Sequence, residues 1–432
     1  MKRIILPVLF SCLVSLSFGQ SLKKANKYLD NKEFEKAKTE VDAYLEKNPK
    51  DAEGLYLKSK LYAKIADSAD LHNLVNGNAR EAAFEAFKQA YADSTNMKAR
   101  LSIMKDNFQP IFDMYGGYYN DAVKDFTEAA QSQSKEKFED AMNNFIKANE
   151  VGSYIGENEW AKIGKVDTTL VLNIGKAAIN AKNDEVAIKY FKELADNKIT
   201  GPSGQKDEDF KLPYEWLELH FKEAGDVDNM LKYAKLGNEL YPQEAYFNFV
   251  LMDYYRDQKD LPKVLDLWKE VVTANPDSLN YKARFANDIF GYIYNSDEGT
   301  ELKDKDQWLS VLKGQLENAL QQDPDNVSAN WLYAQYLYNQ GIEARDMVSK
   351  TTDAAKKADL KKQSIDYWNK AVPYADKAIS QLDQLGKKSD RSRYKSVVNL
   401  MQNIYQSLEN KEKLKQYQDL YDAADKKFET RD

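Results

Sequence analysis

The sequence has few of the residues from which catalytic and metal sites are usually built. It contains one cysteine and two histidines in 432 residues. A single cysteine, Cys12, excludes an intramolecular disulfide and a cluster of thiolate metal ligands. The histidines, His72 and His220, are far apart in sequence, and we expect each to be a surface or packing residue. No H-E-x-x-H, G-x-S-x-G or G-x-G-x-x-G motif occurs. The sequence therefore predicts no enzyme, no metal site and no cofactor.

Proline, glycine and long apolar runs are also scarce. There are 10 prolines and 18 glycines, whereas 30% of the residues are charged and 12% are aromatic. Ala, Lys, Glu and Leu, which are good helix formers, are abundant. No segment after the first twenty residues is apolar enough to span a membrane. This composition predicts an all-α protein with no membrane span.

The N-terminus resembles a secretory signal peptide. Lys2 and Arg3 precede an apolar run over residues 4–18, and Ser17-Phe18-Gly19 has the small-x-small pattern of a cleavage site. We expect cleavage after Gly19 and an exported protein, either periplasmic or associated with the outer membrane. The alternative is a lipoprotein signal in which Cys12 carries a lipid anchor.

The balance of charge is acidic. The formal net charge is −7, and loss of Lys2 and Arg3 with the signal peptide would make it two units more negative. Nucleic acids and anionic membrane surfaces attract basic proteins. We therefore expect neither as a partner.

The prolines indicate an internal repeat. Pro242 and Pro276 lie 34 residues apart, and each closes a helical pattern. When the pattern that ends at Pro49 is counted back, the small residues Ala25 and Ala37 alternate with large apolar ones. Small residues at such positions allow two helices to cross closely.

This spacing resembles the tetratricopeptide repeat (TPR), which has a period of 34 residues. The clearest repeat covers residues 168–201, with Gly175 at its helix crossing. The resemblance implies a right-handed TPR-like α-solenoid of antiparallel helical hairpins, of the type found in exported bacterial proteins. Three longer repeats carry insertions, at residues 68–78, 296–306 and 344–363. We interpret the last insertion as a helix extension.

The domain prediction follows from the regularity of the repeats. Residues 151–167 and 197–213 are rich in glycine and turn residues, so we expect loops there. We therefore divide the chain into a signal peptide, 1–19; irregular TPR-like repeats, 20–200; a TPR array with insertions, 201–393; and a terminal capping hairpin, 394–432.

The resemblance also implies a binding groove, because first-helix positions 2, 5, 9 and 12 line the concave face of such repeats. We expect a protein or peptide partner there, bound by aromatic anchors and a few polar groups. The Lys, Asn and Arg set with which some family members bind a C-terminal carboxylate is not reproduced. The implied function is a scaffold or adaptor in envelope assembly or secretion. The alternatives are a glycan-binding protein of a nutrient-capture system and, least of all, an enzyme. The groove residues are Tyr246, Phe249, Asp253, Arg256, Asn287, Phe290, Tyr336 and Asn339.

Overall fold

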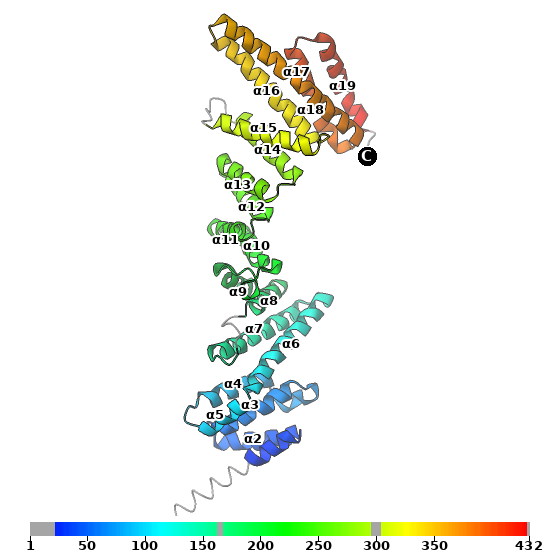
Figure 1. The fold of residues 1–432 in the computed structure, drawn as a ribbon. Helices are drawn as coiled ribbons and strands as arrows, with labels where there is room; N and C mark the ends of the chain where they lie inside the picture. Colours follow the sequence, from blue (N-terminus) through cyan, green and yellow to red (C-terminus); the bar gives the residue numbers. More distant parts are fainter. Residues whose placement is uncertain (1–21, 162–166, 295–303, 430–432) are drawn as a thin grey trace, which may run out of the picture. The chain divides into compact units, whose positions relative to one another are not determined.

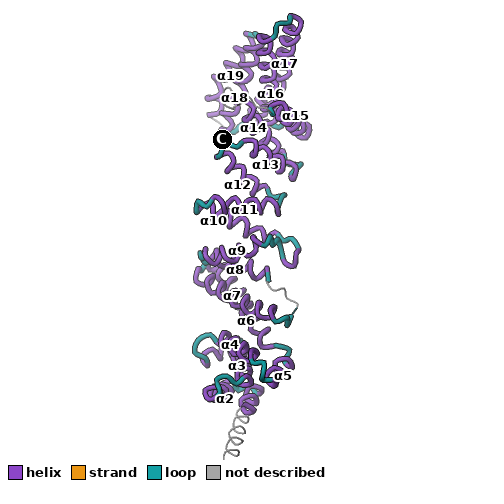
Figure 2. Tube along the Cα trace, turned by 90° about the vertical axis from the view of Figure 1, so that its left-hand side faces the viewer, coloured by secondary structure: helices purple, strands orange, loops and turns teal. Residues whose placement is uncertain are grey.

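The structure is a computed structural model that describes residues 22–161, 167–294 and 304–429 (Figure 1). These residues form helices and connecting loops, and none of them forms a strand (Figure 2). The predicted signal peptide and its Cys12, and residues 296–303 of the second predicted insertion, lie outside the described residues. No helix in the described part of the chain is both long enough and apolar enough to cross a bilayer.

In the described part of the chain, most consecutive helices pack in pairs as hairpins. The contacts divide the chain into two units, Met1–Leu240 and Tyr241–Asp432. An all-α, TPR-like array of helical hairpins is thus confirmed. The domain boundaries proposed after residues 19, 200 and 393 stay predictions.

The first unit begins with a helical segment over residues 22–30. Its paired helices are α3 with α4, α6 with α7, α8 with α9 and α10 with α11. The bounds are α2 (Phe34–Lys47), α3 (Ala52–Ala66), η1 (Ala69–Leu74), α4 (Ala79–Ala92), α5 (Met97–Lys105), α6 (Gln109–Ser132), α7 (Lys135–Glu157), α8 (Thr168–Asn180), α9 (Asp184–Asp196), η2 (Pro202–Gly204), η3 (Glu208–Lys211), α10 (Leu212–Glu223) and α11 (Val227–Leu240).

The described residues of the second unit form the hairpins α12 with α13, α14 with α15, α16 with α17 and α18 with α19. The bounds are α12 (Ala245–Asp257), α13 (Leu261–Ala274), α14 (Leu279–Tyr294), α15 (Lys305–Gln322), α16 (Val327–Lys350), α17 (Ala354–Leu385), η4 (Lys388–Asp390), α18 (Arg391–Ser407) and α19 (Lys411–Glu429).

The predicted period appears in the positions of the helices. α12 begins at Ala245 and α14 begins at Leu279, which is the expected spacing. Small residues lie at the crossings, where Ala25 and Ala37 are fully buried. A Cβ atom added to Gly175 would lie 2.1 Å from the ring of Phe191, so α8 and α9 approach closely because this residue has no side chain.

The turns inside the hairpins repeat one backbone conformation. A residue with positive φ follows the first helix in three successive hairpins: Lys182 (55°), Gly225 (72°) and Lys259 (57°). Side chains also cap the helix starts. For example, the Asp51 carboxylate accepts a hydrogen bond of 2.8 Å from the Gly54 amide at the start of α3. The local sequence therefore specifies where most hairpins turn.

One predicted loop is wrong in part. Residues 151–157 belong to α7, which continues to Glu157. Gly152 and Gly156 had suggested a turn, but Gly156 is buried inside the helix. A Cβ atom on Gly152 would lie 3.0 Å from the ring of Tyr115, so this glycine permits close packing of α7 against α6. Residues 162–166 lie outside the described residues.

The other irregular segments follow the prediction. Residues 197–211 contain two short 3-10 helices, η2 and η3, and α10 begins at Leu212. The insertion at residues 344–363 extends α16 to Lys350 and forms the first part of α17, with a turn at residues 351–353. The insertion at residues 68–78 contains η1.

Candidate functional site

Two of the predicted groove residues, Arg256 and Asn287, line one cavity of about 360 Å³ in the second unit. The cavity lies among α12, α14 and α16, which are the first helices of successive hairpins, and one residue of α13 contributes to it. We call it the first-helix groove. Its other lining residues are Trp268, Asn280, Ala283, Arg284, Asp288, Ser328, Trp331 and Leu332.

A fixed polar network forms one side of the first-helix groove. Arg256 donates to Asp253 at 3.0 Å and to Asp288 at 2.6 Å. The indole N–H of Trp268, which is buried, also donates to Asp288, at 2.6 Å. Because one oxygen of Asp288 accepts from both donors, this carboxylate joins the end of α12 and the middle of α13 to α14.

Arg284 is the cation of the first-helix groove that is open to a ligand. Its guanidinium lies over the ring of Phe249, 4.7 Å from the centroid, and 5.4 Å from that of Trp268. The residue is exposed, and no carboxylate of the described residues lies within ion-pair distance of it. An aromatic face attracts a guanidinium that lies over it, and the N–H groups of the guanidinium remain available to donate.

The ring of Phe249, over which the Arg284 guanidinium lies, packs against two other aromatic rings. Its ring meets Trp268 edge-on at 5.5 Å and Tyr281 edge-on at 5.7 Å. Aromatic pairs with this geometry are stabilising beyond their burial. The structure therefore makes Phe249 a half-buried platform for Arg284, whereas the sequence suggested that it is an anchor for the partner.

The six other predicted residues, Phe249 and Asp253 included, lie outside the cavity lining. Tyr246 is 38% exposed and contacts Phe247, and Phe290 contacts Tyr294 with 4.7 Å between ring centroids. Tyr336 is only 8% exposed, and burial raises its pKa. Asn339 is half-buried on the same helix.

The distance along α16 explains why Tyr336 and Asn339 are not part of the lining. The groove meets the first turn of α16, at Ser328, Trp331 and Leu332. With a rise of 1.5 Å per residue, the two predicted positions lie roughly 6 to 10 Å further along the helix than Leu332.

Several lining residues were missed by the sequence prediction. Asn280 and Ala283 occupy positions 2 and 5 of the repeat that begins at Leu279, so the position rule could have found them. Arg284 and Trp331 occupy repeat positions other than the predicted positions 2, 5, 9 and 12. The indole N–H of Trp331 is buried and has no acceptor within the described residues.

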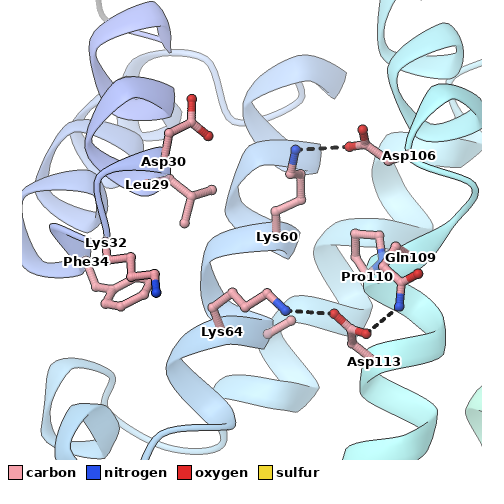
Figure 3. A pocket seen from close by; sticks show the side chains of 11 residues that line it. Leu29, Asp30, Lys32, Phe34, Lys60, Lys64, Asp106, Gln109, Pro110 and Asp113 are labelled. Carbon is pink, nitrogen blue, oxygen red and sulfur yellow. Dashed lines mark hydrogen bonds and ion pairs between the residues drawn. The ribbon is translucent and has the colours of Figure 1, made fainter.

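A second cavity, of about 470 Å³, lies in the first unit (Figure 3). Four of its charged groups are paired, since Lys60 donates to Asp106 at 3.0 Å and Lys64 donates to Asp113 at 2.9 Å. Asp30 and Lys32, which also line the cavity, form no ion pair with the described residues. Burial acts to raise the pKa of Asp106, but hydrogen bonds from Lys60 and Tyr56 together lower it. Nothing in the sequence pattern indicated this cavity, because its acids and lysines come from different elements.

The histidines have packing contacts. His72 is hydrogen-bonded through Nε2 to the Ala66 carbonyl at 3.1 Å. His220 stacks on Trp216, with 4.9 Å between ring centroids, and lies 4.0 Å from Asp184. The residues that the structure describes contain no cluster of histidine, cysteine and acidic side chains that could hold a metal ion.

No protein-family model matches the chain, and no curated protein matches its sequence. Solved helical structures are similar to it. The crystal structure of the P58(IPK) TPR domain aligns over 85% of this chain and 99% of its own, with 14% identity and a TM-score of 0.25. Yeast Tom70 aligns over 95% and 96%, with 12% identity and a TM-score of 0.25.

Human IFIT1, solved as a dimer with PPP-AAAA, aligns over 85% of this chain and 93% of its own. Its identity to the chain is 14% and the TM-score is 0.19. Because these scores are low, we carry none of these proteins' binding properties over to this chain. The hairpins and their spacing are what define the fold.

Proposed function

We propose that this protein is an exported scaffold that binds a protein partner in the first-helix groove. The observation that carries the proposal is Arg284, an exposed guanidinium that lies over the ring of Phe249 and has no carboxylate partner within the described residues. The N–H donors of a guanidinium match the geometry of a carboxylate. An arginine that is held in a cavity with these donors available is therefore suited to bind an acidic group.

The partner segment would present an acidic side chain to Arg284. The exposed amides of Asn280 and Asn287 lie on the same helix, and each can both donate to and accept from a peptide backbone. Trp331 offers an apolar face beside them. A cavity of about 360 Å³ is at the small end of the range for ligand sites, which suits one or two side chains of an extended segment.

Export is the second part of the proposal and is supported by the sequence of residues 1–19. Determining the N-terminus of the mature protein tests it. We expect a chain that begins at Gln20, recovered from the periplasm or the outer membrane. A lipid on Cys12 would indicate an anchored lipoprotein, and an intact Met1 in the cytoplasm would contradict export.

The groove itself is tested by site-specific photocrosslinking. A photoreactive residue in place of Asn287 should give one discrete crosslink to a protein in cells. Replacing Arg284 with Glu should abolish this crosslink, because the new carboxylate would repel the acidic side chain.

Arg345→Glu is the matched control. Arg345 also lies over an aromatic ring, that of Trp368 at 5.7 Å, but it does not line the groove. This variant should keep the crosslink. If both variants keep it, Arg284 is not part of the binding site; if no protein is crosslinked at all, the groove does not bind a protein partner.

A further inference from the structure

Helix α5 belongs to none of the hairpins given above for the first unit. In sequence it follows the hairpin α3–α4 and precedes the hairpin α6–α7, and its main packing partners are α3 and α4. Only Ala99 and Ile103 of its nine residues are buried. Among the described helices of this unit, α5 therefore has no second helix with which to form a hairpin.

The opposite face of α5 is apolar and exposed. Met97, Leu101 and Met104 are 63%, 59% and 58% exposed, and no other large apolar side chain in the described part of the chain is more exposed. Their spacing of four and then three residues places them on one side of the helix, away from Ala99 and Ile103. Methionine side chains are flexible and suit a surface that must adapt to a partner.

The charge of α5 is basic, in contrast to that of the chain. The helix contains Lys98, Arg100 and Lys105 and no acidic residue. Lys98 forms an ion pair with Glu53, and Arg100 lies 4.8 Å from the ring centroid of Tyr91. Lys105 is exposed, and no carboxylate of the described residues is within ion-pair distance of it. Lys98 and Lys105 both lie on the same side of this apolar face of the helix.

We propose that α5 docks an amphipathic helix of a partner protein whose apolar face covers Met97, Leu101 and Met104 and whose acidic edge faces Lys98 and Lys105. The docked helix would take the place of the missing hairpin partner. This inference is independent of the proposed function, because α5 lies in the first unit and the first-helix groove lies in the second.

The observations favour this occupant over two others. If a second copy of the chain docked through the same face, Lys98 and Lys105 of one copy would approach those of the other, and like charges in an interface are repulsive. A lipid surface would attract α5 but would repel the rest of a chain with net charge −7. An acidic amphipathic helix has both an apolar face to cover the exposed side chains of α5 and acidic groups to pair with its lysines.

The probe is a pair of labelled synthetic amphipathic helices with the same leucine face, one flanked by Glu and one by Lys. Binding to the full chain is measured by fluorescence anisotropy. We expect the Glu-flanked helix to bind at least about tenfold more tightly than the Lys-flanked one, a difference of about 1.4 kcal/mol. Leu101→Glu should abolish this binding, and Lys105→Glu should reverse the preference between the two helices.

Leu385→Glu is the matched control, because Leu385 is a comparably exposed leucine (50%) at the end of α17. It should leave binding unchanged. Circular dichroism should show that each variant keeps its helix content, since Ala99 and Ile103 are untouched.

The inference is overturned if neither helix binds, or if Leu101→Glu and Leu385→Glu behave alike. It is also overturned if Leu101→Glu converts a dimer to a monomer in sedimentation, which would identify a second copy as the occupant. Loss of binding to phosphatidylglycerol vesicles in the same variant, without helix binding by the wild type, would identify a lipid surface instead.

Discussion

At the scale of single residues, the glycines inside helices fall into two groups. A Cβ atom on Gly175 would meet the ring of Phe191 at 2.1 Å, and one on Gly341 would meet the indole of Trp368 at 2.3 Å. A Cβ atom on Gly314 would meet nothing within 4 Å. Two opposite effects of a methyl group, helix propensity and overpacking, can therefore be compared in one protein.

Gly175→Ala should lower the free energy of unfolding, and Gly314→Ala should raise it. The helix propensity of alanine is more favourable than that of glycine by about 1 kcal/mol. Overpacking costs roughly 1 to 3 kcal/mol, and Phe191 is fully buried and has little room to move. We expect a loss of about 1 kcal/mol for Gly175→Ala and a gain of about 0.5 to 1 kcal/mol for Gly314→Ala. Urea denaturation measures both, and a gain in both variants would contradict a tight crossing of α8 and α9.

The sequence predicted the close helix crossings more accurately than it predicted the residues that line the candidate site. Gly175 and Ala25 follow the repeat pattern, and the structure confirms that the helices cross closely there. Arg284 did not follow from the pattern, because its importance depends on the absence of a neighbouring carboxylate. That absence is a property of side chains from other helices, and no spacing within one helix reveals it.

At the scale of elements, one buried arginine joins three segments of the first unit. Arg80 of α4 is 6% exposed and donates to Asp67 at 3.2 Å, ahead of η1, and to Asp121 at 2.5 Å, on α6. Its guanidinium lies 5.0 Å from the ring centroid of Tyr118, and a Cβ atom on Gly117 would collide with it. This side chain thus fixes how the hairpin α3–α4 meets α6.

Arg80→Ala should destabilise the first unit by about 1 to 3 kcal/mol. Removing one partner of a fully buried ion pair costs more, but Asp67 and Asp121 are both substantially exposed and can be hydrated again. Hydrogen exchange of the full chain should quicken in α4 and α6, while α18 and α19 are unchanged.

The control for Arg80 is Lys88→Ala on the same helix. Lys88 forms an exposed ion pair with Glu85 one turn away, and its loss should cost less than about 0.5 kcal/mol. Equal effects of the two substitutions would show that Arg80 does not join the hairpin to α6.

Most elements follow from the sequence, and the exceptions have physical reasons. Periodic apolar residues and turn residues predicted the hairpins, including the long pair formed by α16 and α17. The extension of α7 through residues 151–157 was missed because glycine indicates both turns and close helix packing. No element was predicted for α5, because its exposed Met97, Leu101 and Met104 fit no position of the repeat.

At the scale of the whole molecule, buried tyrosines should make the protein sensitive to alkaline pH. The chain has 28 tyrosines, and burial raises the pKa of Tyr118 from 10.0 to about 12. Burial likewise raises the pKa values of Tyr56, Tyr115, Tyr233 and Tyr333. These groups hold their protons more tightly in the folded state than in the unfolded state.

The sign of the effect follows from linkage. Between pH 10 and the higher folded pKa, the unfolded chain has lost a tyrosine proton that the folded chain keeps, so stability falls as pH rises. Below pH 10 this contribution is fully present. We expect the midpoint of urea unfolding to fall steeply from about pH 10 upward, and Tyr118→Phe to reduce the fall. A flat profile between pH 10 and pH 12 would contradict the burial of these hydroxyl groups.

Within each unit, the contacts between neighbouring hairpins also affect the order in which the chain can fold. Within each unit, almost all contacts among the described helices join elements that are close in sequence, so none of the described hairpins needs a distant segment to complete its core. A chain that emerges from a ribosome or a translocation pore N-terminus first can therefore fold hairpin by hairpin while the remainder is still extended. The last hairpin adds to a structure that is already formed.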